Sequence, residues 1–108
     1  IVDSSTEAHM LDLLIYRQSA KVSPDTGPYR YMICGKSCLA GDIFGEFSFE
    51  APLKPGDRIS INDAAGYTMV KKNWFNGVQM PSIVVRELDG SLRCVREFSF
   101  EDYKSSLS

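Results

Sequence analysis

Short segments with an apolar residue at every second position, each followed by turn-forming residues, restrict the fold of this chain most strongly. In the first of them, the large apolar side chains are Tyr29, Tyr31 and Ile33. Similar segments are residues 47–49, 58–62, 67–71, 82–87 and 92–96. Short strands at regular spacing are typical of antiparallel barrels and sandwiches. The sequence therefore predicts a mainly β fold, an antiparallel barrel or sandwich.

Helix-start signals lie near each end of the chain. A serine in residues 4–5 can cap free backbone N–H groups, and Glu7 suits the positive end of the helix dipole. Residues 99–102 (SFED) resemble a capping box, which predicts a short terminal helix through Leu107. The turn-forming residues within 18–28 predict an exposed loop. We therefore expect one short helix near each end, with strands between them.

Length and composition narrow the class of protein. The 108 residues suit one domain that is long enough to bury a core, and the start at Ile1 instead of Met predicts a piece of a longer protein. The formal charge of −2 and the scattered basic residues argue against a nucleic-acid or membrane partner. The odd number of three cysteines favours a reducing cytoplasm over a disulfide-stapled secreted domain.

Residues 35–42 (GKSCLAGD) place a thiol and a carboxylate four residues apart among small residues. Three residues separate Cys34 from Cys38, which is not the spacing of a structural zinc site, and the only histidine is distant, so no metal site is expected. Cys34 continues the strand alternation and is expected to be a buried small hydrophobe. Cys38 lies in a loop whose small residues allow close approach. It is either a structural thiol or an acid that acts on a substrate.

Three further side chains have both a structural and a functional interpretation. Asp42, beside a glycine, has the usual setting of a carboxylate that accepts loop N–H groups. Tyr67 follows a tight turn, where a phenol either anchors a core or donates to a phosphate oxygen. His9 lies on an apolar helix face, which is more typical of a hydrogen-bonded core histidine than of a catalyst.

Six segments together resemble one family. They are residues 3–10 (DSSTEAHM), 35–42, 53–59 (LKPGDRI), 66–71 (GYTMVK), 75–78 (FNGV) and 100–104 (FEDYK). In this order they resemble the C-terminal part of carboxynorspermidine decarboxylases. Those are bacterial pyridoxal-phosphate enzymes of the alanine-racemase-like group (fold type III), related to ornithine and diaminopimelate decarboxylases. The resemblance covers essentially the whole chain.

The resemblance implies that residues 1–108 are the C-terminal β-barrel domain of a longer, two-domain decarboxylase. In the family, an N-terminal (β/α)₈ barrel carries the Schiff-base lysine and the Gly-rich phosphate cradle. No lysine of this chain matches the context of the Schiff-base lysine; the candidates are Lys36, Lys54, Lys71, Lys72 and Lys104. The chain alone is therefore not expected to be active, and its expected partners are the N-terminal barrel and a second subunit.

The resemblance also implies roles for individual residues. Loss of CO₂ leaves a carbanion at Cα that must be protonated, and Cys38 is implied to be the acid, delivered across a dimer interface. Tyr67 matches the tyrosine that hydrogen-bonds the phosphate of pyridoxal 5'-phosphate. Asp3 and His9 lie in the segment that lines the distal end of the substrate pocket, where a carboxylate suits the amines of a polyamine. Asp42 matches an aspartate of the Cys38 motif, either for ligand contact or for bracing the loop.

The residue after Cys38 narrows the implied substrate. Ornithine and diaminopimelate enzymes have an acidic residue there, and this chain has Leu39. The resemblance therefore favours conversion of carboxynorspermidine or carboxyspermidine to norspermidine or spermidine, in polyamine biosynthesis. Two alternatives stay open. One is a non-catalytic β-barrel binding module, and the other is a fold type III decarboxylase for diaminopimelate, ornithine or arginine.

Overall fold

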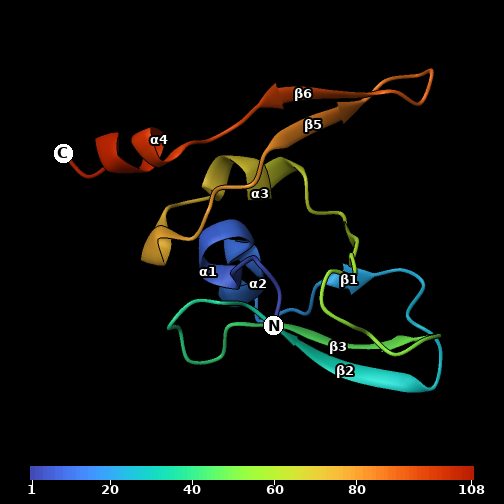
Figure 1. Cartoon of the computed structure of the whole chain (residues 1–108). Helices are drawn as coiled ribbons and strands as arrows, with labels where there is room; N and C mark the ends of the chain where they lie inside the picture. The colour runs from blue at the N-terminus through green and yellow to red at the C-terminus, as the bar shows by residue number, and fades with distance from the viewer.

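The computed structural model describes residues 1–108 and contains short helices and three two-stranded antiparallel sheets. The elements are α1 (Thr6–His9), α2 (Leu11–Ile15), β1 (Lys21–Val22), β2 (Tyr29–Cys34), β3 (Ile43–Phe49), β4 (Ile61–Asn62), α3 (Gly66–Lys71), the 3₁₀ turn η1 (Phe75–Gly77), β5 (Ile83–Arg86), β6 (Leu92–Arg96) and α4 (Phe100–Ser105). The β2–β3 and β5–β6 hairpins lie on opposite sides of the molecule, with α1 and α2 between them (Figure 1).

The main apolar cluster lies on the β2–β3 hairpin. Its register runs from Tyr29 opposite Phe49 to Cys34 opposite Ile43, with an irregularity after Ile33. Four buried residues form the cluster: Ala20, Ile33, Phe44 and Phe47. The backbone N–H of Ala20 donates to the carbonyl of Phe44 at 2.7 Å, which ties the segment after α2 to this hairpin. The period-two pattern thus predicted β2 and the C-terminal part of β3 correctly.

Residues 67–71 are helical, so the predicted strand there is wrong. They belong to α3, in which the N–H of Met69 donates to the carbonyl of Ala65 at 3.0 Å. The apparent alternation spans only a few residues, too few to distinguish a strand from one helical turn. A contact distant in sequence stabilises the helix, because Lys71 Nζ lies 2.7 Å from Asp12 Oδ1 on α2.

Two neighbouring predictions need smaller corrections. Of the strand expected over 58–62, only Ile61–Asn62 is extended in a ladder. Its partner is Lys21–Val22, which lies inside the segment expected to be a loop. Most residues of that segment are exposed, as expected, but Ala20 belongs to the core. Pairing between segments some forty positions apart leaves no local sequence signal.

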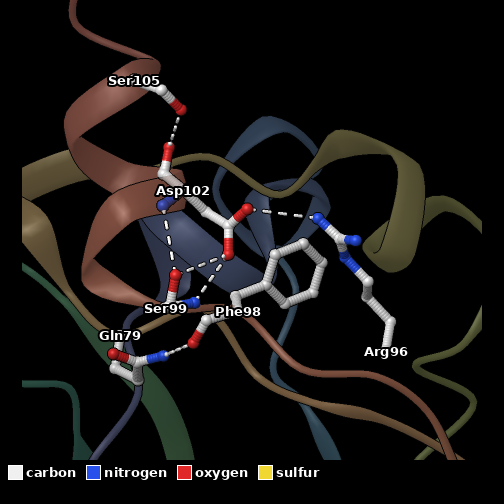
Figure 2. A network of polar contacts seen from close by, with 6 residues as sticks. All are labelled: Gln79, Arg96, Phe98, Ser99, Asp102 and Ser105. Carbon is white, nitrogen blue, oxygen red and sulfur yellow. Dashed lines mark hydrogen bonds and ion pairs between the residues drawn. The ribbon is translucent and has the colours of Figure 1, made fainter.

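The C-terminal helix begins at the predicted capping box (Figure 2). The N–H of Ser99 donates to Asp102 Oδ2 at 2.7 Å, and the N–H of Asp102 donates to Ser99 Oγ at 3.3 Å. Arg96 pairs with the other oxygen of Asp102 at 3.2 Å, and Gln79 Nε2 donates to the carbonyl of Phe98 at 2.7 Å. These contacts join the end of β6 to α4 and to the segment before β5. The helix ends at Ser105, two residues before the predicted end.

Hydrogen bonds join the strands only in pairs, and no closed barrel forms. Only 12 of the 108 residues are buried, fewer than expected for a domain with a core of its own. The β5–β6 hairpin exposes Val84, Leu88, Leu92 and Val95. The expected antiparallel β structure is therefore present, as small sheets with few helices. No helix is both long and apolar enough to span a membrane.

Candidate active site

The site is built around α1, a short helix that is buried on one side. Its cap is Ser5, whose side-chain oxygen accepts the N–H of Ala8 at 3.3 Å. Ser5, Thr6, Ala8 and His9 are all buried. The predicted helix start is confirmed, and it places the polar groups of Thr6 and His9 inside the protein.

Asp42 joins the loop 35–42 to α1. Its Oδ1 accepts both the N–H and the hydroxyl of Thr6 at 2.7 Å, and its Oδ2 accepts the N–H of Ser37 at 3.2 Å and the hydroxyl of Ser37. The residue is 6% exposed. A Cβ at Gly35 would lie 2.4 Å from this carboxylate, so only glycine permits the close approach. Asp42 therefore braces the loop against α1.

The surroundings of Asp42 change its acidity. Burial alone raises the pKa of Asp42, but the hydrogen bonds from Ser37 and Thr6 outweigh it and lower the pKa to about 2. The group is therefore a carboxylate throughout the neutral range. Each of its two carboxylate oxygens already accepts two hydrogen bonds from the protein.

Cys38 lies in a loop, as predicted from the small residues around it, and its side chain is exposed. Backbone bonds hold both sides of the turn: the N–H of Gly35 donates to the carbonyl of Asp42 at 2.8 Å, and that of Lys36 to the carbonyl of Ser4 at 2.9 Å. The N–H of Cys38 donates to Asn76 Oδ1 at 2.7 Å. Cys34, expected to be buried, is only half-buried, because β2 ends there at an irregularity in the ladder.

His9 is a buried histidine with one satisfied ring nitrogen. Its Nδ1 lies 2.8 Å from Ser4 Oγ, whereas Nε2 is buried without a hydrogen-bond partner. Burial lowers the pKa of His9 most, and the charge of Lys36 lowers it further, against the opposing charges of Asp3 and Asp42. The buried surroundings therefore favour the neutral ring, and its Nε2 has no hydrogen-bond partner.

The Phe-Asn-Gly sequence of residues 75–77 is typical of an ordinary turn, but the segment 73–77 also makes contacts that the sequence does not predict. The side-chain amide of Asn73 donates to the carbonyl of Glu7 at 3.0 Å, and the backbone N–H of Asn73 donates to the carbonyl of Ala8 at 2.8 Å. Asn76 has φ 60° and ψ 12°, the left-handed conformation expected from the Asn-Gly pair. The Asn-Gly pair predicts this turn, but nothing in the sequence predicts that Asn76 contacts the loop 35–42.

Tyr67 is exposed on α3, beside a pocket of about 480 Å³ that α2, β1 and β4 also line. Lys71 Nζ lies 4.8 Å from the centroid of the Tyr67 ring. The hydrogen bond that Lys71 donates to Asp12 is the main reason that the pKa of Lys71 is raised. A phenol and a fixed ammonium group thus lie side by side on one helix face.

The structure brings some of the predicted site residues together and separates others. Asp42, Cys38 and His9 lie on the joined segments of α1 and the loop 35–42. Asp3 is exposed just before α1, in the lining of a second pocket. Tyr67 lines a different pocket, to which none of the other four contributes. No three His, Cys, Asp or Glu side chains cluster as a metal site would require.

No family model matches the sequence. Among curated proteins, it is 71% identical over its full length to a carboxynorspermidine/carboxyspermidine decarboxylase of Herminiimonas arsenicoxydans, covering 30% of that protein. It is 36% identical over 95% of its length to the protein of that name from Campylobacter jejuni, covering 31% of it. A carboxyaminopropylagmatine decarboxylase of Synechocystis is 41% identical over 99% of the chain, which covers 29% of that protein.

A solved structure agrees with these sequence matches. The crystal structure of carboxynorspermidine decarboxylase from Campylobacter jejuni, complexed with norspermidine, superposes on 96% of this chain with a TM-score of 0.89 and 34% identity. The chain covers 32% of that structure. The resemblance to carboxynorspermidine decarboxylases is thereby confirmed. The chain spans less than a third of the length of the relatives it matches.

Proposed function

We propose that residues 1–108 are the C-terminal domain of a pyridoxal-phosphate-dependent decarboxylase that acts on carboxynorspermidine or carboxyspermidine. The match to such an enzyme at 71% identity over the full chain carries this proposal. The small buried core and the exposed apolar residues of β5–β6 support it, because a further domain or subunit would cover them. In this proposal, an N-terminal (β/α)₈ barrel supplies the Schiff-base lysine, and three free thiols suit a cytoplasmic enzyme.

The residues around Tyr67 fit the phosphate of pyridoxal 5'-phosphate. The exposed phenol is a hydrogen-bond donor, and Lys71 supplies a positive charge 4.8 Å from its ring. Bound in the complete enzyme, the cofactor would act as the electron sink that makes loss of CO₂ from an α-amino acid possible. The contribution of this chain to cofactor binding would be a hydrogen bond from Tyr67 to the phosphate.

Cys38 would supply the proton that replaces the carboxyl group. After the bond between Cα and the carboxylate breaks and CO₂ leaves, Cα of the substrate takes the proton of Cys38 Sγ, and the thiolate then regains a proton from water. The exposed turn permits this, because its thiol is open to a substrate that the rest of the enzyme binds. The brace through Asp42 limits the movement of the turn.

A dimer would combine the two separated parts of the site. Cys38 does not contribute to the pocket that Tyr67 lines. An arrangement in which Cys38 reaches the site of the other subunit uses both residues without requiring them to meet within one chain. This separation supports a homodimer with composite sites.

The substrate's distal amines would meet Asp3 and His9. Asp3 is an exposed carboxylate, and His9 Nε2 is a buried acceptor or donor without a partner. A cationic amine forms its strongest hydrogen bonds with a carboxylate. The relative of known structure was solved with norspermidine, a polyamine, which supports this class of ligand. Asp42 would act as the brace of the loop, since the protein itself occupies both of its oxygens.

A substrate panel with the complete enzyme tests the proposed function. Carboxynorspermidine and carboxyspermidine are expected to release CO₂ with the highest kcat/KM, above diaminopimelate, ornithine and arginine. Carboxyaminopropylagmatine is the second candidate, because the Synechocystis relative carries that name. A complete protein that releases no CO₂ from any of these compounds would refute the decarboxylase proposal and favour a binding module.

Substituting Tyr67→Phe in the complete enzyme is expected to weaken cofactor binding by about 10- to 100-fold, because one hydrogen bond to a charged group is worth roughly 1.5–3 kcal/mol. Titration of the apoenzyme with pyridoxal phosphate, followed by absorbance, measures the change. Tyr16→Phe is the matched control, since Tyr16 lines the same pocket from the end of α2. Equal affinities for the wild type and Tyr67→Phe would contradict the phosphate role.

A further inference from the structure

We propose that Asn76 is a positioning residue for Cys38: its carboxamide accepts the backbone N–H of Cys38 and so fixes where the thiol is presented. This inference rests on the proposed function for the chemical role of Cys38. The contact itself is independent of that role. It joins residues that are 38 positions apart, with a nitrogen-to-oxygen distance of 2.7 Å.

The backbone at Asn76 is specialised for this contact. Asn76 adopts φ 60°, and Gly77 follows with φ 64°. Asparagine is one of the few residues with a side chain that enter this left-handed region at low cost. The conformation brings the carboxamide to the Cys38 turn. A residue that only had to close the turn could be glycine, but glycine has no acceptor.

Both partners of the contact are held by the same helix. Asn73 anchors the segment 73–77 to α1 through two hydrogen bonds, to the carbonyls of Glu7 and Ala8. Asp42 anchors the other side, the loop 35–42, to α1 through Thr6. The hydrogen bond between Cys38 and Asn76 joins these two anchored segments directly. The remaining side-chain contacts of the turn are local: Ser37 donates to Asp42, and the N–H of Leu39 donates to Ser37 Oγ at 3.3 Å.

The contact lies at the surface, so we expect it to affect reaction geometry more than stability. Cys38 and Asn76 are both exposed. A reacting group that is misplaced by about 1 Å can lose up to ~10²-fold in rate. Loss of the Asn76 acceptor leaves the Asp42 brace intact. An intermediate loss, in kcat and not in substrate binding, is therefore expected.

Two variants of the complete holoenzyme separate the carboxamide from the turn. Asn76→Gly keeps the left-handed backbone and removes the acceptor, whereas Asn76→Asp keeps both an acceptor oxygen and the tolerance for positive φ. For Asn76→Gly we expect kcat to fall by about tenfold, with KM and the cofactor absorbance unchanged. Asn76→Asp should restore kcat to about the wild-type value, because it keeps an oxygen that accepts the N–H of Cys38.

A second readout needs no turnover. The alkylation rate of Cys38 by iodoacetamide, followed by mass spectrometry of its peptide, is expected to change at least threefold in Asn76→Gly. Cys94, exposed on β6, is the internal control and should keep its rate. Unchanged kcat and labelling in Asn76→Gly, or a kcat plateau equally low in both variants, would overturn the positioning role. If Cys38→Ala kept full turnover while labelling still responded to Asn76, only the acid role would fail.

Discussion

Replacing Cys38 with alanine in the complete enzyme is expected to lower kcat by about 10²- to 10⁴-fold, the range of general acid catalysis, while the absorbance of the bound cofactor is retained. The thiol is exposed on a braced turn and belongs to neither of the two pockets described. Its loss should therefore affect the protonation of Cα and not cofactor binding. Single-turnover measurements would show CO₂ release less affected than formation of the amine product.

Two other cysteines provide matched controls for this prediction. Cys34 ends β2, four positions before Cys38, and Cys94 is exposed on β6. Alanine at either position should leave kcat within about twofold of the wild type, as is usual for a substitution away from the reacting atoms. Wild-type turnover in Cys38→Ala, or loss of the cofactor absorbance with the remaining turnover unchanged, would contradict the acid role.

The local sequence pattern was sufficient to predict most strands of the two hairpins and the starts of the first and last helices. The strands β2, β5 and β6 were predicted because their alternation is bounded by turn residues. The cap of α4 was predicted from the spacing of Ser99 and Asp102. Helix α3 was mistaken for a strand because its stability depends on docking against α2, where Asp12 and Lys71 are 59 positions apart. No window of a few residues contains that information.

A barrel or sandwich was expected from the regular spacing of the short strands, and the family resemblance implied a barrel, whereas barrel closure depends on partners for every sheet edge. Residues such as Leu88 and Leu92 are apolar and exposed in this chain. The pattern of a strand is the same whether its apolar face is covered by the same chain, by another domain or by a second subunit. The chain length therefore predicted a larger core than these 108 residues form by themselves.

The sequence and the resemblance indicated candidate site residues but not the contacts that hold them in place. The resemblance indicated Cys38, Tyr67, Asp3 and His9, and the small residues around Cys38 predicted a loop that permits close approach. The side chains that hold this loop were not foreseen, because Thr6 lies 36 positions from Asp42 and Asn76 lies 38 positions from Cys38. Contacts between residues so far apart in sequence have no local sequence signal, so only the folded structure reveals them.

Substituting Asp42→Ala is expected to destabilise the loop 35–42 and α1 by about 3 kcal/mol, because buried donors left without an acceptor cost roughly 1–3 kcal/mol each. Thr6 would lose the acceptor of both its N–H and its hydroxyl, and Ser37 would lose the acceptor of its N–H. Hydrogen exchange of the complete enzyme, followed by mass spectrometry, measures the change. Peptides that contain Thr6 and Ser37 should exchange about 10²-fold faster.

The pH dependence of the same exchange tests the carboxylate itself. The folded pKa of Asp42, about 2, lies below its ordinary value of 3.8, so its charge stabilises the fold above the unfolded pKa. That stabilisation, about 2 kcal/mol, is lost as the pH falls from ~4 through ~2. Exchange rates corrected for intrinsic pH effects should therefore rise in acid for the wild type and much less for Asp42→Asn.

Asp57→Asn is the control for this prediction. Asp57 is an exposed carboxylate that accepts the N–H of Lys54 at 2.9 Å within its own turn. Its substitution should leave the exchange of the Thr6 and Ser37 peptides, and its acid dependence, as in the wild type. If Asp42→Ala protected both peptides as well as the wild type does, the brace would not be what holds the Cys38 turn against α1. The acid role would then have to rest on a loop positioned by Asn76 and the backbone bonds of Gly35 and Lys36.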